Sequence, residues 1–193
     1  MKIEKGQKIP EFSFDTHVRD SVKISDAVKE QKYTVLWVLR YIGCPTCRLD
    51  VHVIGGRYQE LADRGAKVYV VMQSDRAHVR ADLEKTKEEL PFEIVCDPGQ
   101  AIYELLSVEP GPEPDPDAPF AGMDEAVLAK IIAKVQTAEK LGFVHGDYEG
   151  NEQQLPAMFI LDGEGVVKYA HYAADPADMP DLDAVLGLLE RYK

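Results

Sequence analysis

The sequence predicts one α/β domain, spanning residues 1–193, in which helices flank a central mixed β-sheet. Nearly continuous apolar runs at 33–39 and 66–73 are rich in Val and aromatic residues, which is typical of strands buried on both faces of a sheet. A helix-length stretch at 45–64 separates them, and strand, helix, strand in this order indicates a βαβ unit. A chain of 193 residues is long enough for one domain with a full core.

The elements before and after this unit follow from local signals. The stretches IPEFSFDT and SVKISDAV predict a small N-terminal hairpin that leads into a short helix. After the second strand, Ser74 or Asp75 can cap a helix, and Pro91 lies just past its end. FEIVCD, at 92–97, then predicts a third strand, followed by a turn and the short helix QAIYELLSV.

The C-terminal part has the strongest hairpin signal in the chain. AMFILD and VVKYAHY are strand-like and flank a turn of sequence DGEG at 162–165. LDAVLGLLERY predicts a closing helix. Together these elements predict that the sheet ends in a hairpin covered by a helix.

An insertion at 109–150 precedes the penultimate strand. Its first part, 109–119, has five prolines and four acidic residues, which predicts an extended, solvated spacer. Its second part, 124–141, predicts an amphipathic helix with Asp124 as cap and Gly142 as stop. Apolar residues recur on one face of this helix, at Val127, Leu128, Ile131, Ile132, Val135 and Leu141. We expect this face to pack on the domain itself or on a partner subunit.

Composition excludes several classes of protein. With 45% hydrophobic and 29% charged residues the chain is globular. A formal net charge of −12 argues against nucleic acid as a partner, because nucleic-acid affinity comes mainly from clustered Lys and Arg. No apolar run approaches the roughly 20 residues that span a bilayer, and the first residues lack the apolar core of a secretory signal. We therefore expect no membrane association and a cytoplasmic location.

Two of the three cysteines form a CPTC motif directly after the first buried strand. Pro45 fits the first position of a helix, which puts Cys44 at the helix N-terminus. Unpaired backbone N–H groups and the helix dipole stabilise an anion there, so a Cys44 thiolate is favoured. Cys47 lies one turn further, close enough to attack a sulfur attached to Cys44. Redox chemistry is therefore the favoured interpretation of this pair.

Other roles for the cysteines and their neighbours remain open at this stage. A structural zinc site needs four ligands, and no second paired motif exists, although Cys96 and a histidine are conceivable partners. The two thiols can also be inert packing residues. Cys96 lies in an apolar strand and is interpreted as core, with a distant resolving thiol as the alternative. Arg40 and Arg48 can add positive charge to the site or lie on the solvated surface. His52, His145 and His171 have no spacing that marks ligands or bases.

With these residues in hand, the chain resembles a peroxiredoxin-like member of the alkyl hydroperoxide reductase and thiol-specific antioxidant family, within the thioredoxin-fold superfamily. The stretches that carry the resemblance run along most of the chain, and only 109–150 falls outside the common core. They are KGQKIPEFSFDT, VKISDAV, YTVLWVLRYIGCPTC, VYVVMQSDRAHVRADLEK, LPFEIVCDPGQAIYELLSV and LPAMFILDGEGVVKYAH. The chain is similar throughout to a subgroup that contains CxxC. The resemblance implies a thioredoxin-like fold.

The resemblance also implies roles for residues around the motif. Cys44 occupies the peroxidatic position, followed by Pro45 and Thr46. The family usually carries Thr or Ser three residues before this Cys, where Tyr41 stands here, and an Arg shortly before the Phe of the penultimate strand. Pro156 occupies that region instead and is the thioredoxin-like choice. In a thioredoxin-type site the preceding residue, here Leu155, faces the CxxC with its bond cis, and its free backbone edge receives a substrate.

The sequence thus predicts a thiol-dependent oxidoreductase with antioxidant, peroxiredoxin-like activity. Cys44 is the nucleophile that attacks a peroxide or a protein disulfide, and Cys47 resolves it into a Cys44–Cys47 disulfide. A thiol reductant such as a thioredoxin-like protein must then restore the dithiol. No cofactor or metal is implied, and a homodimer fits the resemblance because peroxiredoxins often dimerise. The alternatives are a disulfide reductase without peroxidase activity and a non-catalytic, redox-gated interaction protein. The Tyr41 hydroxyl is a candidate replacement for the missing Thr.

Overall fold

The computed structural model describes residues 1–117 and 121–192, and these residues form a seven-stranded sheet in the order β2-β1-β5-β4-β3-β6-β7. The strands are β1 (Ser13–Thr16), β2 (Val22–Lys23), β3 (Tyr33–Val38), β4 (Ala66–Met72), β5 (Glu93–Cys96), β6 (Ala157–Asp162) and β7 (Val167–Tyr172). The central strands β3, β4 and β5 are parallel, whereas β1, β6 and β7 run antiparallel to their neighbours. The predicted mixed α/β sheet is confirmed.

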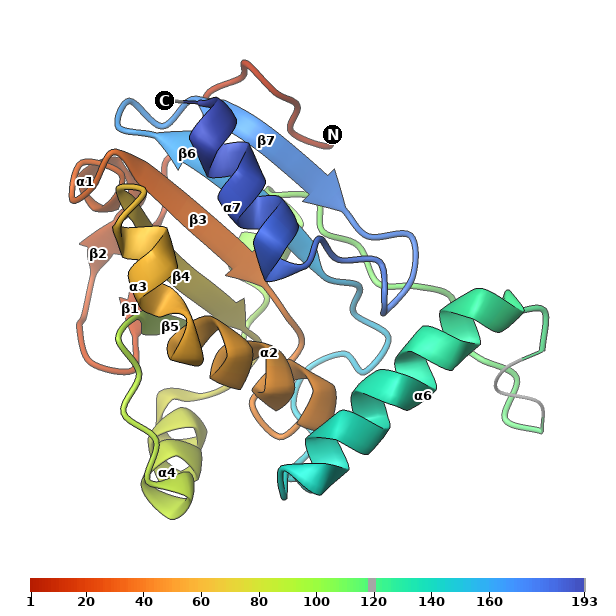
Figure 1. Ribbon diagram of the computed structural model, residues 1–193. Coiled ribbons are helices and arrows are strands. Elements are labelled where there is room, and N and C mark those ends of the chain that lie inside the picture. Colours follow the sequence, from red (N-terminus) through yellow and green to blue (C-terminus); the bar gives the residue numbers. More distant parts are fainter. Residues whose placement is uncertain (118–120, 193) are drawn as a thin grey trace.

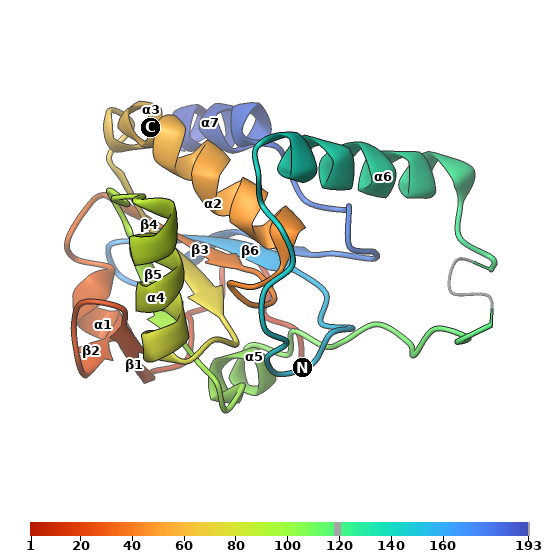
Figure 2. The ribbon, with the colours of Figure 1, turned by 90° about the horizontal axis from the view of Figure 1, so that it is seen from below.

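The helices are α1 (Ile24–Ala27), α2 (Pro45–Gly56), α3 (Tyr58–Ala62), α4 (Arg76–Thr86), α5 (Ala101–Leu105), α6 (Glu125–Lys140) and α7 (Leu182–Arg191). Figure 1 shows α7 and α2 crossing one face of the sheet, and Figure 2 shows α5 on the opposite face. No helix in the described part of the chain has both the length and the apolar character needed to span a bilayer.

Alternation along β3 builds a hydrophobic core on each face of the sheet. All six residues of β3 are buried, as the continuous apolar run predicts for a central strand. Val35 and Trp37 belong to the core under α2 and α7, while Leu36 and Val38 belong to the core under α1 and α5. Because both faces are covered, β3 is held firmly, and the loop that follows it starts from a fixed point.

The helix-length stretch at 45–64 forms two helices rather than one. The break falls at Arg57, whose φ of −119° and ψ of 15° leave the helical region. Gly55 and Gly56 precede it, and glycine is a poor helix former, so the chain bends where propensity is lowest. The Arg57 guanidinium then pairs with Glu60 and with Asp183 of α7, which fixes the new direction.

Local capping signals explain other boundaries. Asp75, one of the two predicted caps, accepts a hydrogen bond from Ala77 N at 2.8 Å and begins α4. At the predicted C-terminal hairpin, the Asp162 carboxylate accepts hydrogen bonds from the backbone N–H groups of Glu164 and Val166, at 3.0 and 2.9 Å. These bonds close the turn between β6 and β7.

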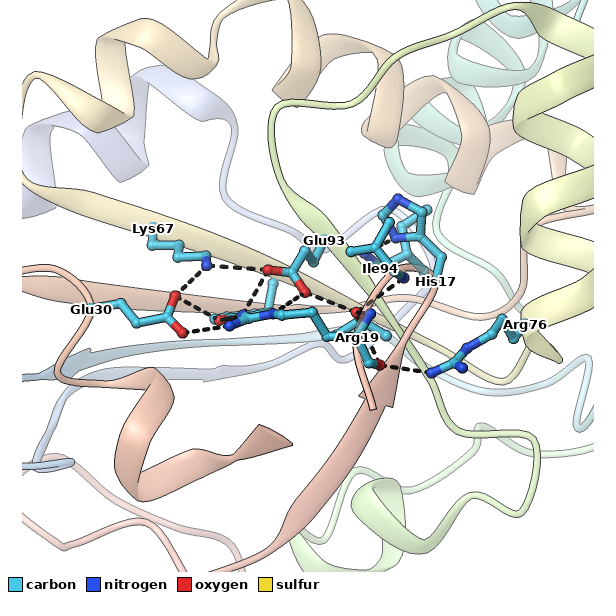
Figure 3. A network of polar contacts seen from close by, with 10 residues as sticks. His17, Arg19, Glu30, Lys67, Arg76, Glu93 and Ile94 are labelled. Carbon is cyan, nitrogen blue, oxygen red and sulfur yellow. Dashed lines mark hydrogen bonds and ion pairs between the residues drawn. The ribbon is translucent and has the colours of Figure 1, made fainter. Parts of the chain in front are cut away.

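A network of ion pairs fastens the N-terminal hairpin to the sheet (Figure 3). Arg19, in the loop between β1 and β2, donates to Glu93 of β5 at 2.8 Å and pairs with Glu30 at 2.9 Å. Lys67 of β4 bonds both of these glutamates, and the hydroxyl of Tyr69 donates to Glu30 at 3.1 Å. Lys67 and Glu93 lie at the starts of their strands, opposite the strand ends that carry the cysteine loop.

The insertion has the two predicted parts. Residues 109–117 are exposed or half-buried and mostly irregular, while 118 and 119, the end of the predicted spacer, lie outside the described residues. Asp124 caps α6, as predicted, by accepting from Ala126 N and Val127 N. The helix projects beside α2, and the two helices are in contact (Figures 1 and 2). Its apolar face is incompletely covered: Ala138 is buried, but Ile132 and Leu141 are 46% and 50% exposed.

Candidate active site

Cys44 caps the N-terminus of α2. Strand β3 ends at Val38, and Cys44 follows in an extended conformation, with φ −78° and ψ 119°. Pro45 takes the first helical position, where its missing N–H costs nothing. The Cys44 sulfur accepts a hydrogen bond from Cys47 N at 3.4 Å. The sulfur therefore lies at the positive end of the helix dipole, where a thiolate is stabilised.

Two side chains complete the surroundings of the Cys44 sulfur. The Arg40 guanidinium donates to Sγ at 3.0 Å, and the Thr46 hydroxyl lies 3.2 Å from it. The hydrogen bond with the Cys47 thiol, the charge of Arg40 and the bond to Thr46 together lower the pKa of Cys44 to about 4, against the opposing effect of burial. At neutral pH Cys44 is a thiolate.

Cys47 has the opposite character. Its side chain is 6% exposed, and its hydrogen bond to Cys44, its burial and the nearby thiolate charge raise its pKa well above the usual range. It therefore stays a neutral thiol while Cys44 is ionised. Since the two residues are three apart on one helix, their spacing suits a disulfide.

The returning limb of the insertion covers the cysteine loop; we call residues 143–152 the strap. Gly146 N donates to Gly43 O at 2.8 Å, so the two backbones touch. A Cβ on Gly43 would meet Asp147 O at 2.4 Å, which only glycine avoids. The Glu152 carbonyl accepts from Arg40 at 2.7 Å. Under the strap the Cys44 side chain is fully buried, at 0% exposure.

Glu149 anchors the strap to the loop after β4. Its carboxylate accepts from Ser74 Oγ at 2.7 Å and from Asp75 N at 3.0 Å, and it pairs with His78 at 2.7 Å. Ser74 Oγ in turn accepts from Ile42 N, two residues before Cys44. The strap is thus connected by hydrogen bonds to the loop that carries Cys44.

A small crevice lies beside this site and is lined by neighbours of Cys44 rather than by Cys44 itself. Its volume is about 20 Å³, and its lining includes Arg40, Thr46 and Cys47, together with Pro156 and Asp50. One water molecule needs roughly 10–15 Å³ on this measure, so the crevice holds something little larger than water. Small reactants suit this site as it stands.

Leu155 and Pro156 differ from the thioredoxin-type expectation. No cis peptide bond occurs within the described ranges, so the Leu155–Pro156 bond is trans. The backbone edge here is also already paired: Gln154 forms an antiparallel bridge with Pro110, and Gly111 N donates to Gln153 O at 2.8 Å. The start of the insertion therefore occupies the edge that was expected to receive a substrate. Pro156 lines the crevice, whereas the side chain of Leu155 packs toward Gly111.

The hydroxyl of Tyr41 contacts the strap rather than the Cys44 sulfur. It lies 3.2 Å from His145 Nε2 of the strap and is not among the groups that hydrogen bond to the Cys44 sulfur in the structure described. The Tyr41 carbonyl accepts from Cys44 N at 3.2 Å, so its contribution is to the turn. Thr46, two residues after Cys44 rather than three before it, supplies the hydroxyl.

Arg48 does not belong to the site. It is buried, at 2% exposure, and pairs with Asp82 at 2.7 Å and Glu88 at 2.7 Å, which ties α2 to α4 and the loop that follows. Its guanidinium also lies over the ring of Phe143, 5.2 Å from the ring centre. Of the two arginines considered from the sequence, Arg40 contacts the Cys44 sulfur, whereas Arg48 pairs with Asp82 and Glu88.

The remaining candidates lie elsewhere. Cys96 ends β5 opposite Asp15 of β1, and burial raises its pKa to about 12, which favours a packing role over a reactive one. His52 contacts Glu88, and His171 contacts the carbonyl of Asp178. Within residues 1–117 and 121–192, no cluster of three or more His, Cys, Asp or Glu side chains is arranged to hold a metal ion.

Two charged side chains at the crevice, those of Asp50 and Lys134, were not predicted from the sequence. Asp50 lies three residues after Cys47 on α2 and pairs with Lys134 of α6 at 2.7 Å. The helical spacing was a usable signal for Asp50. No sequence signal pointed to Lys134 or to the strap, because both reach the site only through the fold of the insertion.

With this geometry established, comparison with known proteins identifies the family. A model of the AhpC/TSA family matches residues 5–170. The chain belongs to the AhpC/TSA family. No curated protein matches its sequence. Among solved structures, this AhpC/TSA protein is similar to a Cys-to-Ser mutant of peroxiredoxin 6 from Arenicola marina, with a TM-score of 0.70 and 13% sequence identity. The match covers 97% of this chain and 72% of the Arenicola chain.

A second similar structure is the yeast mitochondrial 1-Cys peroxiredoxin, with a TM-score of 0.67 and 15% identity over 97% of this chain and 75% of that one. At these identities the likeness establishes the fold, which is the thioredoxin-like fold of peroxiredoxins. Membership of the AhpC/TSA family and this fold make the protein a thiol-dependent oxidoreductase of the peroxidase type.

Proposed function

We propose that this AhpC/TSA protein reduces peroxides with Cys44 as nucleophile and Cys47 as resolving thiol. The observation that carries the proposal is the surroundings of the Cys44 sulfur: a thiolate bonded to Arg40 and Thr46, fully buried, beside a crevice of about 20 Å³. A peroxide fits such a space, whereas a folded protein's disulfide does not reach it without movement of the strap.

The chemistry proceeds in two steps, an oxidation by peroxide and a condensation that forms the disulfide. The Cys44 thiolate attacks one peroxide oxygen, the O–O bond breaks, and the leaving oxygen departs as water or an alcohol after taking up a proton. Arg40 and Thr46 are placed to stabilise the negative charge that moves from the sulfur to the oxygens. The resulting Cys44 sulfenic acid then condenses with Cys47, releasing water and forming the Cys44–Cys47 disulfide.

Arg40 offers a physical replacement for the arginine missing from the penultimate strand. It comes from the loop after β3, four residues before Cys44, yet its guanidinium bonds the same sulfur. A planar guanidinium also has further donors for a second acceptor, here the Glu152 carbonyl. Its position supports peroxide as the oxidant.

Reduction of the disulfide requires a partner thiol. The yeast mitochondrial 1-Cys peroxiredoxin is described as resolving its thiol via glutathione and thioredoxin systems. By analogy we propose a dithiol protein or a glutathione-type thiol as the reductant here, and the cytoplasm, where such thiols are kept reduced, as the compartment. A homodimer remains part of the proposal.

The deciding experiment is the second-order rate constant of the reduced protein with hydrogen peroxide, followed by the fluorescence of Trp37, the single tryptophan. Cys44→Ser is the control, and a small free thiolate at the same pH is the reference. We expect a rate constant well above the reference that is lost in Cys44→Ser. A rate constant no greater than the reference would overturn the proposal and move the assignment to disulfide exchange, which the CxxC motif also permits.

A further inference from the structure

The insertion contributes a charged pair to the crevice. Asp50 of α2 and Lys134 of α6 form an ion pair at 2.7 Å, with side chains that are 20% and 26% exposed. Burying both partners to this degree costs solvation, which their mutual attraction offsets. The pair lies where α6 contacts α2, and it is not needed to begin or end either helix.

Asp50 borders the same space as the resolving cysteine. Cys47, Asp50 and Lys134 all line the crevice of about 20 Å³. Residues three apart on a helix have neighbouring side chains, and the charge of the Asp50 carboxylate is close enough to contribute to the raised pKa of Cys47.

The proposed reaction leaves a proton without an acceptor. Cys47 is a buried neutral thiol, and the hydrogen bond to the Cys44 thiolate, burial and that thiolate's charge all hold its pKa high. Oxidation of Cys44 to a sulfenic acid removes the neighbouring negative charge. Cys47 can then ionise by passing its proton to a base that borders the crevice.

Among the groups around the crevice, Asp50 is the suitable base. Arg40, Lys134 and Lys130 are cations, and Cys44 has by then been oxidised. Asp181, which borders the adjoining cavity, already caps α7 by accepting from Ala184 N. Burial raises the pKa of Asp50, which makes it a stronger base than a solvated carboxylate. The charge of Lys134 lowers this pKa, so the carboxylate can still ionise.

We propose that Asp50 accepts the proton of Cys47 during disulfide formation and that Lys134, brought by the insertion, holds the carboxylate in place. The Cys47 proton passes to Asp50, the Cys47 sulfur attacks the Cys44 sulfur, and the S–O bond of the sulfenic acid breaks. The departing hydroxide takes the proton from Asp50 and leaves as water. The sulfenic sulfur is reduced and the Cys47 sulfur oxidised, so no further reactant is needed. The inference rests on the proposed formation of the Cys44–Cys47 disulfide.

The test separates the oxidation of Cys44 from the formation of the disulfide in a single turnover with hydrogen peroxide. Trp37 fluorescence follows the oxidation of Cys44, and quenching with a sulfenic-acid trap at timed intervals follows its conversion to disulfide. We expect Asp50→Asn to leave the first rate within about twofold and to slow the second at least about tenfold, because a positioned general base contributes about 10²–10⁴-fold. Glu139→Gln, an exposed carboxylate lost from α6, should change neither step.

The pH dependence distinguishes a proton acceptor from a structural residue. In the wild-type protein the rate of disulfide formation should fall at acid pH as Asp50 is protonated, which gives the pH profile an acid limb. The Asp50→Asn variant should lack this limb. Lys134→Gln should move the limb to higher pH, because the cation lowers the pKa of Asp50. Asp50→Glu keeps a carboxylate and should recover part of the rate of disulfide formation. This variant replaces Asp50→Asn in the test if Asp50→Asn does not fold.

Two results would overturn the inference, and a third would point elsewhere. Disulfide formation in Asp50→Asn at the wild-type rate would remove Asp50 from the reaction. An unchanged pH limb in both Asp50→Asn and Lys134→Gln would do the same. In contrast, a wild-type protein that forms no Cys44–Cys47 disulfide at all would contradict the proposed function, and with it the step in which Asp50 acts.

Discussion

At the scale of single residues, the reactivity of this protein depends on what surrounds one sulfur atom. Cys44 and Cys47 are chemically identical, yet the pKa of the first is lowered to about 4 and that of the second is raised. The difference arises because Cys44 receives hydrogen bonds from Arg40, Thr46 and the helix N-terminus, whereas Cys47 donates to Cys44 from a buried position. Position along one helical turn thus separates a thiol with a lowered pKa from one with a raised pKa.

Replacing Arg40 tests the source of this activation. Arg40→Met removes the charge beside Cys44, so the pKa of Cys44 should rise from about 4 and the rate constant with peroxide should fall about 10- to 100-fold. The loss corresponds to a hydrogen bond to a charged group, worth about 1.5–3 kcal/mol. The pH dependence of Cys44 alkylation measures the pKa, and stopped-flow fluorescence measures the rate.

Tyr41→Phe is the matched control for Arg40→Met. Its hydroxyl contacts His145 rather than the sulfur, so both the pKa of Cys44 and the peroxide rate should stay near wild type. A large fall in the peroxide rate of Tyr41→Phe would assign the hydroxyl a catalytic role after all, and an unchanged Arg40→Met would refute the activation described here.

At the scale of elements, the strap decides how far Cys44 is sheltered. Residues 143–152 are mostly exposed and lie over the cysteine loop, held chiefly by polar contacts and by the close approach of Gly43 and Gly146. Segments with few buried apolar contacts open more readily than the core. Glu149 is the main anchor, since its carboxylate bonds Ser74, Asp75 N and His78.

Glu149→Gln should loosen the strap without unfolding the sheet. An amide has one acceptor oxygen and no charge, so the bonds to Ser74, Asp75 and His78 cannot all persist, at a cost of about 1–3 kcal/mol in local stability. We expect faster hydrogen exchange at residues 143–152 and faster alkylation of Cys44 by bulky reagents. Glu164→Gln, in the exposed turn between β6 and β7, is the control. Unchanged exchange in the strap would show that Glu149 is not its anchor.

The His78 contact makes the anchoring of the strap depend on pH. The bond to Glu149 raises the pKa of His78 above its usual value. Because the histidine has a higher pKa in the folded protein, the contact with Glu149 is fully stabilising below the unfolded-state pKa of about 6.5. The stabilisation is lost as the pH rises through the folded-state pKa. The protection factors of the strap amides, which are exchange rates corrected for the intrinsic pH dependence of amide exchange, should therefore fall from pH 6 to pH 8.

At the scale of the whole molecule, the sheet is fastened by its two cores and by the ion network around Arg19. Bonds from Arg19, Thr16 and Lys67 hold the pKa of Glu93 below its usual range, although burial alone would raise it. Because the carboxyl has a lower pKa in the folded protein, its ion pairs stabilise the fold above the unfolded-state pKa of about 4.3. This stabilisation is lost as the pH falls through the folded-state pKa. The network should therefore support the fold more at neutral than at acid pH.

Glu93→Gln tests this contribution. We expect the free energy of unfolding at pH 7 to fall by about 1–3 kcal/mol, since Arg19 and Lys67 each lose a charged acceptor. Urea unfolding at pH 7 and at pH 4 should show a smaller difference between wild type and variant at the acid pH. Peroxide reactivity should stay unchanged, because the network lies at the opposite end of β4 and β5 from the cysteine loop. An equal loss at both pH values would rule out the ionised carboxylate as the cause.

Sequence alone determined the βαβ core, the capping of α6, the hairpin of β6 and β7, and the position of Cys44 at the N-terminus of α2, because each depends on local patterns of apolar, capping and turn residues. Only the tertiary structure decided which groups meet the sulfur. It selected Arg40 over Arg48, placed Thr46 rather than the Tyr41 hydroxyl at the thiolate, and paired the backbone before Pro156 with the insertion. It also brought Lys134 and the strap to the crevice from a distant part of the chain. Such contacts depend on how distant elements pack, and no local pattern records that packing.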